Sequence, residues 1–203
     1  MSQRSQLAES GARPRLPLLP PSALSPEQKE LYQNIMNSGV PTLDGAVTQR
    51  EDGALVGPFN AMLHFPMFGA SAWAFNRSLI EQSKLPKPVQ QLVVLETTAK
   101  FGARYAIYAH EIFATDAGLS AAKIATIVAG ERPSDLSRQE AVAYDLAAAL
   151  NRGTTLPEGT FRAAQEVLGD RGLAEVVFLV GCFSMVSVIL NAYDVTVPGR
   201  DGL

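Results

Sequence analysis

Residues 89–116, VQQLVVLETTAKFGARYAIYAHEIFATD, decide the fold of this chain. In the first half of this stretch, apolar side chains recur at the spacing of one helix face, which predicts a helix that ends at Gly102. A second helical pattern covers residues 105–116 and stops at Gly118, because glycine readily adopts the left-handed backbone that closes a helix. Two consecutive helices are therefore expected, and the second carries His110.

Capping signals predict further helices on both sides of this stretch. Ser25-Pro-Glu-Gln28 and Ser137-Arg-Gln-Glu140 each place a serine three residues before a glutamine or glutamate. In such a capping box, the two side chains satisfy backbone N–H groups that the start of a helix leaves unpaired. A helix is expected to follow each box, and Ser120 is expected to cap a shorter one.

Prolines mark the start or the end of several other helices. Residues 57–64 predict a short helix that stops at Pro66, and a longer helix follows to about residue 82. In this longer helix, Trp73, Leu79 and Ile80 are expected to point inward.

The C-terminal third contains two more expected helices. Pro157 opens one that ends before Gly169, and an apolar helix is expected over about residues 173–193. Its most apolar part, residues 176–190, is shorter than the roughly 20 residues that cross a bilayer, so it is expected to be buried in protein. No two segments alternate as paired strands do, and the sequence therefore predicts an all-α protein.

Three segments lack a helical pattern. Residues 1–22 are rich in proline and predict an extended arm, and residues 39–57 predict a loop of a length often found in lids. Residues 199–203 form a short tail. A single domain is therefore expected over residues 23–198, in agreement with a chain of 203 residues.

The charge pattern and the single cysteine exclude several kinds of partner. The 17 basic and 20 acidic residues are scattered without long blocks of one sign, so no nucleic-acid partner is expected. Residues 1–10 lack the apolar run of a signal peptide, which favours a cytoplasmic protein without a membrane partner. Cys182 lies inside the apolar stretch 176–190 and is expected to be a buried thiol.

Several short strings of residues occur in a characteristic order along the chain. They are LSPEQ (24–28), GPFNAMLH (57–64), QLVVL (91–95) leading to YAIYAHE (105–111), AGLS (117–120) and LNAYD (190–194). In their order and spacing, they resemble the carboxymuconolactone decarboxylase and alkylhydroperoxidase D family over most of the chain from Arg15 to Pro198. The resemblance implies a single-domain helical fold that assembles into homotrimers or hexamers.

The redox pair of that family has no counterpart here. In its peroxidase branch, the second cysteine of a Cys-x-x-Cys pair stands four residues before a histidine. With His110 as that histidine, the pair falls on Ala103 and Ala106. Peroxide reduction by thiols needs an attacking thiolate and a resolving thiol, and alanine supplies neither. The two small side chains indicate either room for an organic substrate beside His110 or close helix packing.

A second departure concerns Gln91, where many relatives carry the glutamate of a proton relay. Glutamine does not titrate, but it donates and accepts hydrogen bonds, so Gln91 is expected to position a substrate. Glu96, further along the same helix, is expected to pair with an arginine.

His110 is the first candidate for a catalytic group, since the resemblance places it at the family's helical histidine. An imidazole titrates near neutrality and can move a proton to or from a carbon beside a carbonyl. His64 and Tyr108 are further catalytic candidates. For both histidines the alternative is structural, because a histidine can bind a backbone carbonyl or end a helix.

A carboxylated substrate would need a cation. Arg77 and Arg104 are the candidates because both lie in otherwise apolar segments. Asn60, in the string 57–64, is a further candidate for substrate binding. The methionines and aromatic residues between positions 62 and 75 are either the wall of a substrate chamber or ordinary core. The two histidines form no metal-ligand pattern with nearby carboxylates, and neither a metal nor a cofactor is expected.

These features favour a cofactor-free lyase, similar to the decarboxylases, that acts on a small cyclic or unsaturated carboxylic acid or lactone. Histidine-mediated proton transfer would be its central step, although isomerisation and retro-aldol cleavage make the same demands. The alternative is a non-catalytic or ligand-binding protein. A residual peroxidase is disfavoured because the thiols are absent.

Overall fold

The computed structural model of the chain describes residues 15–39 and 45–198, and this part is helical without a strand. Gln49 and Leu55 form an isolated antiparallel bridge in the loop before the second helix. The helices are α1 (Pro26–Met36), α2 (Pro58–His64), α3 (Pro66–Gln82), α4 (Lys87–Phe101), α5 (Arg104–Asp116), α6 (Ala121–Val128), α7 (Arg138–Leu150) and α8 (Glu158–Ala192). The prediction of an all-α fold is confirmed.

The predicted caps explain where several helices begin. At α1 the Ser25 hydroxyl accepts from the backbone N–H of Gln28 at 3.3 Å, and the Gln28 side chain accepts from the Ser25 N–H at 2.8 Å. Ser137 and Glu140 repeat both bonds at α7. These reciprocal bonds form between neighbours in sequence, and for that reason the sequence alone located both helix starts.

Helix α8 consists of two helical segments joined at Gly169. The backbone of Gly169 has φ 70° and ψ 173°, which breaks the helix at the position predicted from the sequence. By length and composition alone, α8 is apolar enough to cross a membrane. In the described structure, however, the side chains of Val176, Cys182 and Val186 are buried against the other helices.

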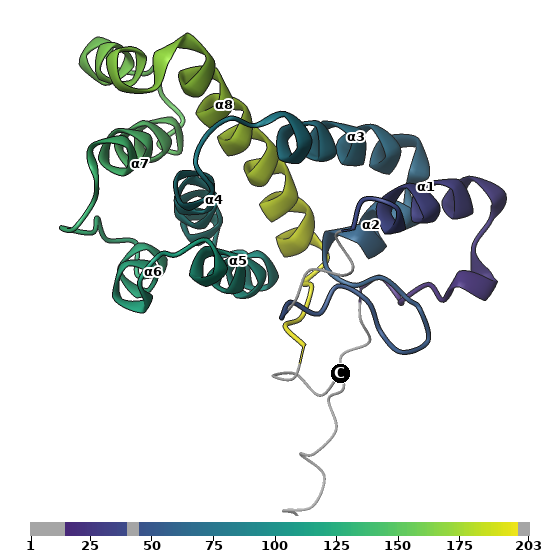
Figure 1. Cartoon of the computed structure of the whole chain (residues 1–203). Coiled ribbons are helices and arrows are strands. Elements are labelled where there is room, and N and C mark those ends of the chain that lie inside the picture. Colours follow the sequence, from purple (N-terminus) through teal and green to yellow (C-terminus); the bar gives the residue numbers. More distant parts are fainter. Residues whose placement is uncertain (1–14, 40–44, 199–203) are drawn as a thin grey trace, which may run out of the picture.

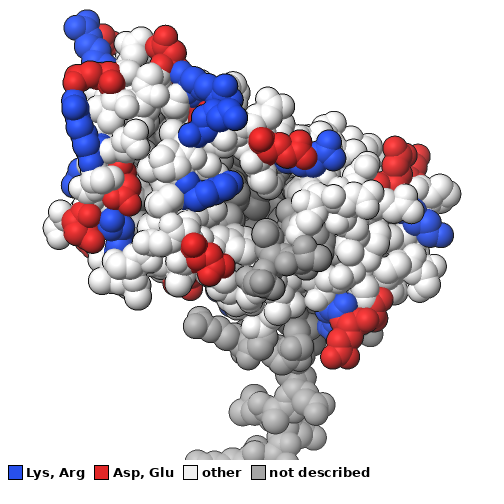
Figure 2. Space-filling model, viewed as in Figure 1, with Lys and Arg blue, Asp and Glu red and all other residues white. Residues whose placement is uncertain are grey.

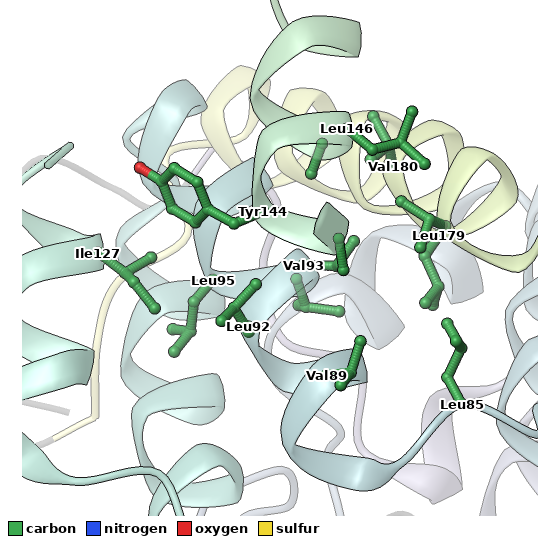
Figure 3. Close-up of a cluster of buried hydrophobic side chains, with 14 of the residues drawn as sticks. Leu85, Val89, Leu92, Val93, Leu95, Ile127, Tyr144, Leu146, Leu179 and Val180 are labelled. Atoms are coloured by element: carbon green, nitrogen blue, oxygen red, sulfur yellow. The ribbon is translucent and has the colours of Figure 1, made fainter. Parts of the chain in front are cut away.

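Helix α4 lies at the centre of the largest hydrophobic cluster. It packs against α5, α6, α7 and α8, and α8 runs between this group and the group formed by α1, α2 and α3 (Figure 1). Figure 3 shows Leu92 and Leu95 of α4 beside Ile127 of α6, with Leu179 of α8 on the other side of the cluster. Because Leu92 and Leu95 are fully buried, this half of the molecule forms a solid core.

Two smaller clusters complete the interior. One joins α1, α2 and α3 through residues such as Leu31, Phe59 and Trp73. The other joins the loop before α2 with α5 and the end of α8, and it includes Tyr105 and Leu190. The three clusters leave a space where they meet.

One predicted inward-facing residue is exposed, and parts of three predicted segments lie outside the described residues. Ile80 was expected to point inward, but its side chain is 47% exposed, at the border of a cavity that is partly open to solvent. Residues 1–14 of the predicted arm, residues 40–44 of the predicted lid and residues 199–203 of the tail lie outside the described residues. Residues 54–57, in the described part of the loop, are buried.

Charged side chains of both signs are interspersed on the face seen in Figure 2. They gather at the end formed by α7 and the first part of α8, and neither sign forms a continuous patch in this view. This distribution agrees with the net charge of -3 and gives no sign of a surface for a polyanion on this face.

Candidate functional site

A cavity of about 570 Å³ lies where the three hydrophobic clusters meet. Helices α2, α3, α4, α5 and α8 all contribute to its wall, and it is partly open to solvent. Its size falls within the range of sites for small organic molecules, roughly 300 to 1,000 Å³.

His110 borders this cavity and is fixed by a neighbouring helix. Its Nδ1 lies 2.8 Å from Oε1 of Gln91, which belongs to α4 and also borders the cavity. An amide oxygen can only accept a hydrogen bond, so Nδ1 carries the proton and Nε2 carries the lone pair. Nε2 has no hydrogen-bond partner among the described residues and is the nitrogen available to a ligand.

Aromatic rings hold the imidazole on both sides. Phe113 and Phe183 meet the His110 ring edge to face, with centroids 5.3 and 4.9 Å away. Such contacts restrict the orientation of the ring without offering it a charge partner. Burial therefore lowers the pKa of His110 from 6.5 to about 3, and the imidazole is neutral at physiological pH.

The two alanines at the positions of the family's thiols have different surroundings. Ala106 borders the cavity, as does Ala109, the residue before His110. Ala103 is completely buried and packs in the cluster around α5 instead. One of the two small residues therefore adds volume to the cavity, and the other serves close packing.

The charged groups at the cavity differ from the expected ones. Arg77 is exposed and pairs with Glu81 one helical turn away, whereas Arg104 is exposed and pairs with Asp194. Neither arginine borders the cavity, contrary to the expectation. The charged side chains among its described lining residues are Lys87 and Asp116, and both are exposed at the edge.

His64 and Asn60 hold the described part of the N-terminal arm instead of bordering the cavity. The Nε2 of His64 lies 2.8 Å from the carbonyl oxygen of Pro17. Asn60 donates to the same carbonyl at 3.2 Å and accepts from the Leu19 N–H at 3.3 Å. This is the structural alternative raised for His64.

Tyr108 binds the loop before α2 through a hydrogen bond. Its hydroxyl accepts from the N–H of Val47 at 3.2 Å, and the hydroxyl of Tyr105 donates to the carbonyl of Val47 at 2.8 Å. Gly57 permits this arrangement, because a Cβ there would lie 2.3 Å from the ring of Tyr105. Tyr105 borders the cavity, but Tyr108 does not.

Two further candidates have structural surroundings. Cys182 is buried and accepts a hydrogen bond from Asn76 at 3.4 Å, which confirms the prediction of a buried thiol. Glu96 accepts a hydrogen bond from the side chain of Asn151 at the end of α7 and forms no ion pair with an arginine. Burial raises the pKa of Glu96 to about 7, although the Asn151 hydrogen bond opposes the shift.

Sequence reasoning missed two unpaired polar atoms in residues that line the cavity. The indole nitrogen of Trp73 and the hydroxyl of Thr48 belong to lining residues that are 3% and 4% exposed. Both atoms are buried away from the open space of the cavity, and neither has a hydrogen-bond partner in the described part of the chain. Their isolation is a property of the folded chain, and no pattern in the sequence signals it.

Comparisons with known proteins place the fold but not the activity. No family model matches the sequence, and no curated protein matches it. The structure is similar to the crystal structure of an alkylhydroperoxidase AhpD core, an uncharacterized peroxidase-related protein from Ralstonia eutropha. The TM-score is 0.75 at 17% sequence identity, and the match covers 92% of this chain and 93% of the other.

Proposed function

From the alkylhydroperoxidase D-like fold of this chain, we propose that it is a cofactor-free lyase acting on a small cyclic or unsaturated carboxylic acid or lactone. The observation that carries the proposal is His110, a neutral imidazole whose Nδ1 is bound to Gln91 and whose Nε2 is available at an organic-sized cavity. A group of this kind transfers protons to and from carbon.

The arrangement suits decarboxylation in two steps. When an anionic substrate binds, its carboxylate favours protonation of Nε2, because an opposite charge nearby stabilises the imidazolium. The bond between carbon and carboxylate then breaks, carbon dioxide leaves, and the electron pair passes into the conjugated carbonyl. The resulting enolate takes the proton from Nε2 at carbon, which returns the imidazole to its neutral form. The net reaction consumes one proton.

Gln91 has a positioning role in this scheme. Its Oε1 holds the Nδ1–H of His110 in both protonation states and therefore keeps Nε2 directed away from α4. A glutamine stabilises the imidazolium less than a carboxylate does, so the proton gained on substrate binding is readily given up to carbon.

The second candidate is a ligand-binding protein without catalysis. The observation that favours it is the pKa of His110, which burial lowers to about 3, since the free protein then holds no proton on Nε2 near neutrality. Both candidates use the same cavity, and they differ only in whether a bound substrate restores the proton.

A thiol peroxidase is disfavoured. Ala106 stands at the cavity where a thiol would be needed, and Cys182 is buried outside the described lining. Burial also raises the pKa of the Cys182 thiol, which opposes formation of the reactive thiolate.

The proposal includes a homo-oligomer. Phe68 on α3 and Phe178 and Val188 on α8 are 74%, 55% and 55% exposed, and Phe75 of α3 meets Phe178 edge to face. Apolar groups that continue across two helices are typical of interfaces between subunits. Phe178→Glu should therefore lower the mass measured by light scattering at micromolar concentration. Phe161→Glu, at an exposed position on the first segment of α8, is the control.

The catalytic proposal is tested with His110→Gln on a panel of lactones and unsaturated acids. Glutamine keeps a hydrogen-bonding side chain but cannot titrate, so turnover should fall by roughly 100-fold or more while the fold persists. Cys182→Ala should leave turnover nearly unchanged and cost some stability through the space it opens. Wild-type turnover in His110→Gln would favour the ligand-binding alternative.

A further inference from the structure

We propose that this cavity accepts a predominantly apolar compound that bears at most one carboxylate, and that it rejects dicarboxylates. The inference deepens the proposed function, on which it rests for the role of His110. It narrows the substrate from carboxylic acids in general to those whose body is apolar. Two observations carry it: the charges at the wall and the capacity of His110.

The cavity wall has almost no positive charge that could pair with a buried carboxylate. No arginine stands among the described lining residues, and Lys87 lies at the exposed edge together with the opposite charge of Asp116. Lys87 also donates to the side chain of Gln90 at 3.4 Å. Buried lining residues such as Phe59, Leu179 and Val186 are apolar. A carboxylate placed among them without a partner would lose its hydration with nothing in exchange.

His110 can compensate one such charge but not two. Protonation of Nε2 on binding turns a neutral imidazole and an anion into an ion pair without net charge. The other titratable lining groups are Lys87 and Asp116 at the edge and Tyr105, whose hydroxyl donates to Val47 and whose pKa is raised by burial. None of these three gives the interior a second positive charge, so a second carboxylate would remain unpaired.

The test uses a matched series on one aromatic skeleton. The naphthyl ketone prodan is uncharged, and its emission moves to shorter wavelength in apolar surroundings, so it reports occupation of the cavity directly. Trp73 is the single tryptophan of the chain and borders the cavity, so energy transfer from Trp73 to prodan gives a second signal. Methyl naphthoate, naphthoate and naphthalenedicarboxylate then compete with prodan for the full chain.

The charge of each compound determines its expected affinity for the cavity. Prodan binds with a blue shift, and the ester and the monocarboxylate displace it. The dicarboxylate competes roughly 100-fold more weakly, because its second charge is buried without a partner. Absence of prodan binding, or a dicarboxylate that competes as well as the monocarboxylate, would overturn the inference.

Variants locate the binding site. Ala106→Leu fills the cavity and should weaken prodan binding by roughly tenfold or more, whereas Ala125→Leu, at an exposed position on α6, should not. Ala109→Leu, at a second lining position, should weaken prodan binding in the same way. Circular dichroism establishes that each variant is folded, and Ala109→Leu serves if Ala106→Leu is not. Prodan affinity unchanged in every folded cavity variant would contradict the inference.

The binding experiment can succeed or fail independently of the catalytic proposal, because none of its measurements requires turnover. If the affinities follow the expected order but His110→Gln retains full turnover, the lyase fails and the ligand class stands. If the dicarboxylate binds tightly while His110→Gln is inactive, the ligand class fails and the lyase stands.

Discussion

The surroundings of His110 and of His64 differ in what each leaves available to a ligand. Nε2 of His64 lies against the carbonyl of Pro17, so its ring holds a segment of the chain. His110 uses Nδ1 to bind Gln91 and leaves Nε2 without a partner at a cavity. The same side chain therefore serves as an anchor in one place and as a candidate proton carrier in the other. The two histidines differ because a cavity lies beside the ring of His110, whereas a chain segment lies beside the ring of His64.

The largest effect in this comparison is expected from replacing Gln91, which binds His110, and not from replacing Asn60, which binds the same carbonyl as His64. Gln91→Leu removes the acceptor of the His110 Nδ1–H, which frees the ring to change tautomer, and turnover should fall by roughly 10- to 100-fold. Asn60→Leu, beside His64, should leave turnover unchanged while it weakens the contact with the arm. Kinetics of both variants on one substrate measure the contrast, and equal losses would contradict it.

Glu96 lies on the same helix as Gln91, and its surroundings differ from those of both histidines. Burial raises its pKa to about 7, so the folded protein binds more protons than the unfolded chain between pH 4.5 and 7. Stability should therefore fall as pH rises through this window. Glu96→Gln mimics the protonated form and should stabilise the protein by roughly 2 kcal/mol at pH 8, with little effect at pH 4. Urea denaturation at both pH values checks this, and an equal effect at both would argue against it.

The arm contact is expected to have a smaller effect. Asn60→Ala removes the two hydrogen bonds to residues 17–19 and should lower stability by about 1 to 2 kcal/mol. His64→Gln should lower it less, because glutamine can still donate to the Pro17 carbonyl. Thermal unfolding measures both changes. A loss of turnover in folded His64→Gln would show that His64 does more than anchor the arm.

The smallest effect is expected at Tyr108. Tyr108→Phe removes one hydrogen bond to the loop, whose partner Val47 is 42% exposed and can bind water instead. Stability should therefore change by about 0.5 kcal/mol, and turnover should stay close to that of the wild type. A large loss of turnover with unchanged stability would restore Tyr108 as a catalytic candidate.

The helices were predictable because their signals are local. Ser25 and Ser137 bind residues three positions away, and Gly169 breaks α8 through its own backbone. His110 and Gln91 were each named through the resemblance, but their contact was not predicted, since 19 positions separate the two residues. The structural similarity confirms the fold that the resemblance implied.

Whether the other candidate residues reach the cavity depends on which face of their helix points inward. Arg77 lies in an apolar segment, yet it faces solvent beside Glu81, and this pairing one turn apart was visible in the sequence. Arg104 pairs with Asp194, 90 positions away, and nothing local signals that contact. The isolation of Trp73 likewise follows from contacts between distant segments.

The most direct test is a measurement of the two histidines by nitrogen-15 NMR, with His64→Gln to assign the signals. We expect that His110 carries its proton on Nδ1 and stays neutral from about pH 8 down to about pH 5, because burial lowers its pKa to about 3. A His110 that titrates between about pH 6 and 7, or that carries its proton on Nε2 in the free protein, would contradict the account.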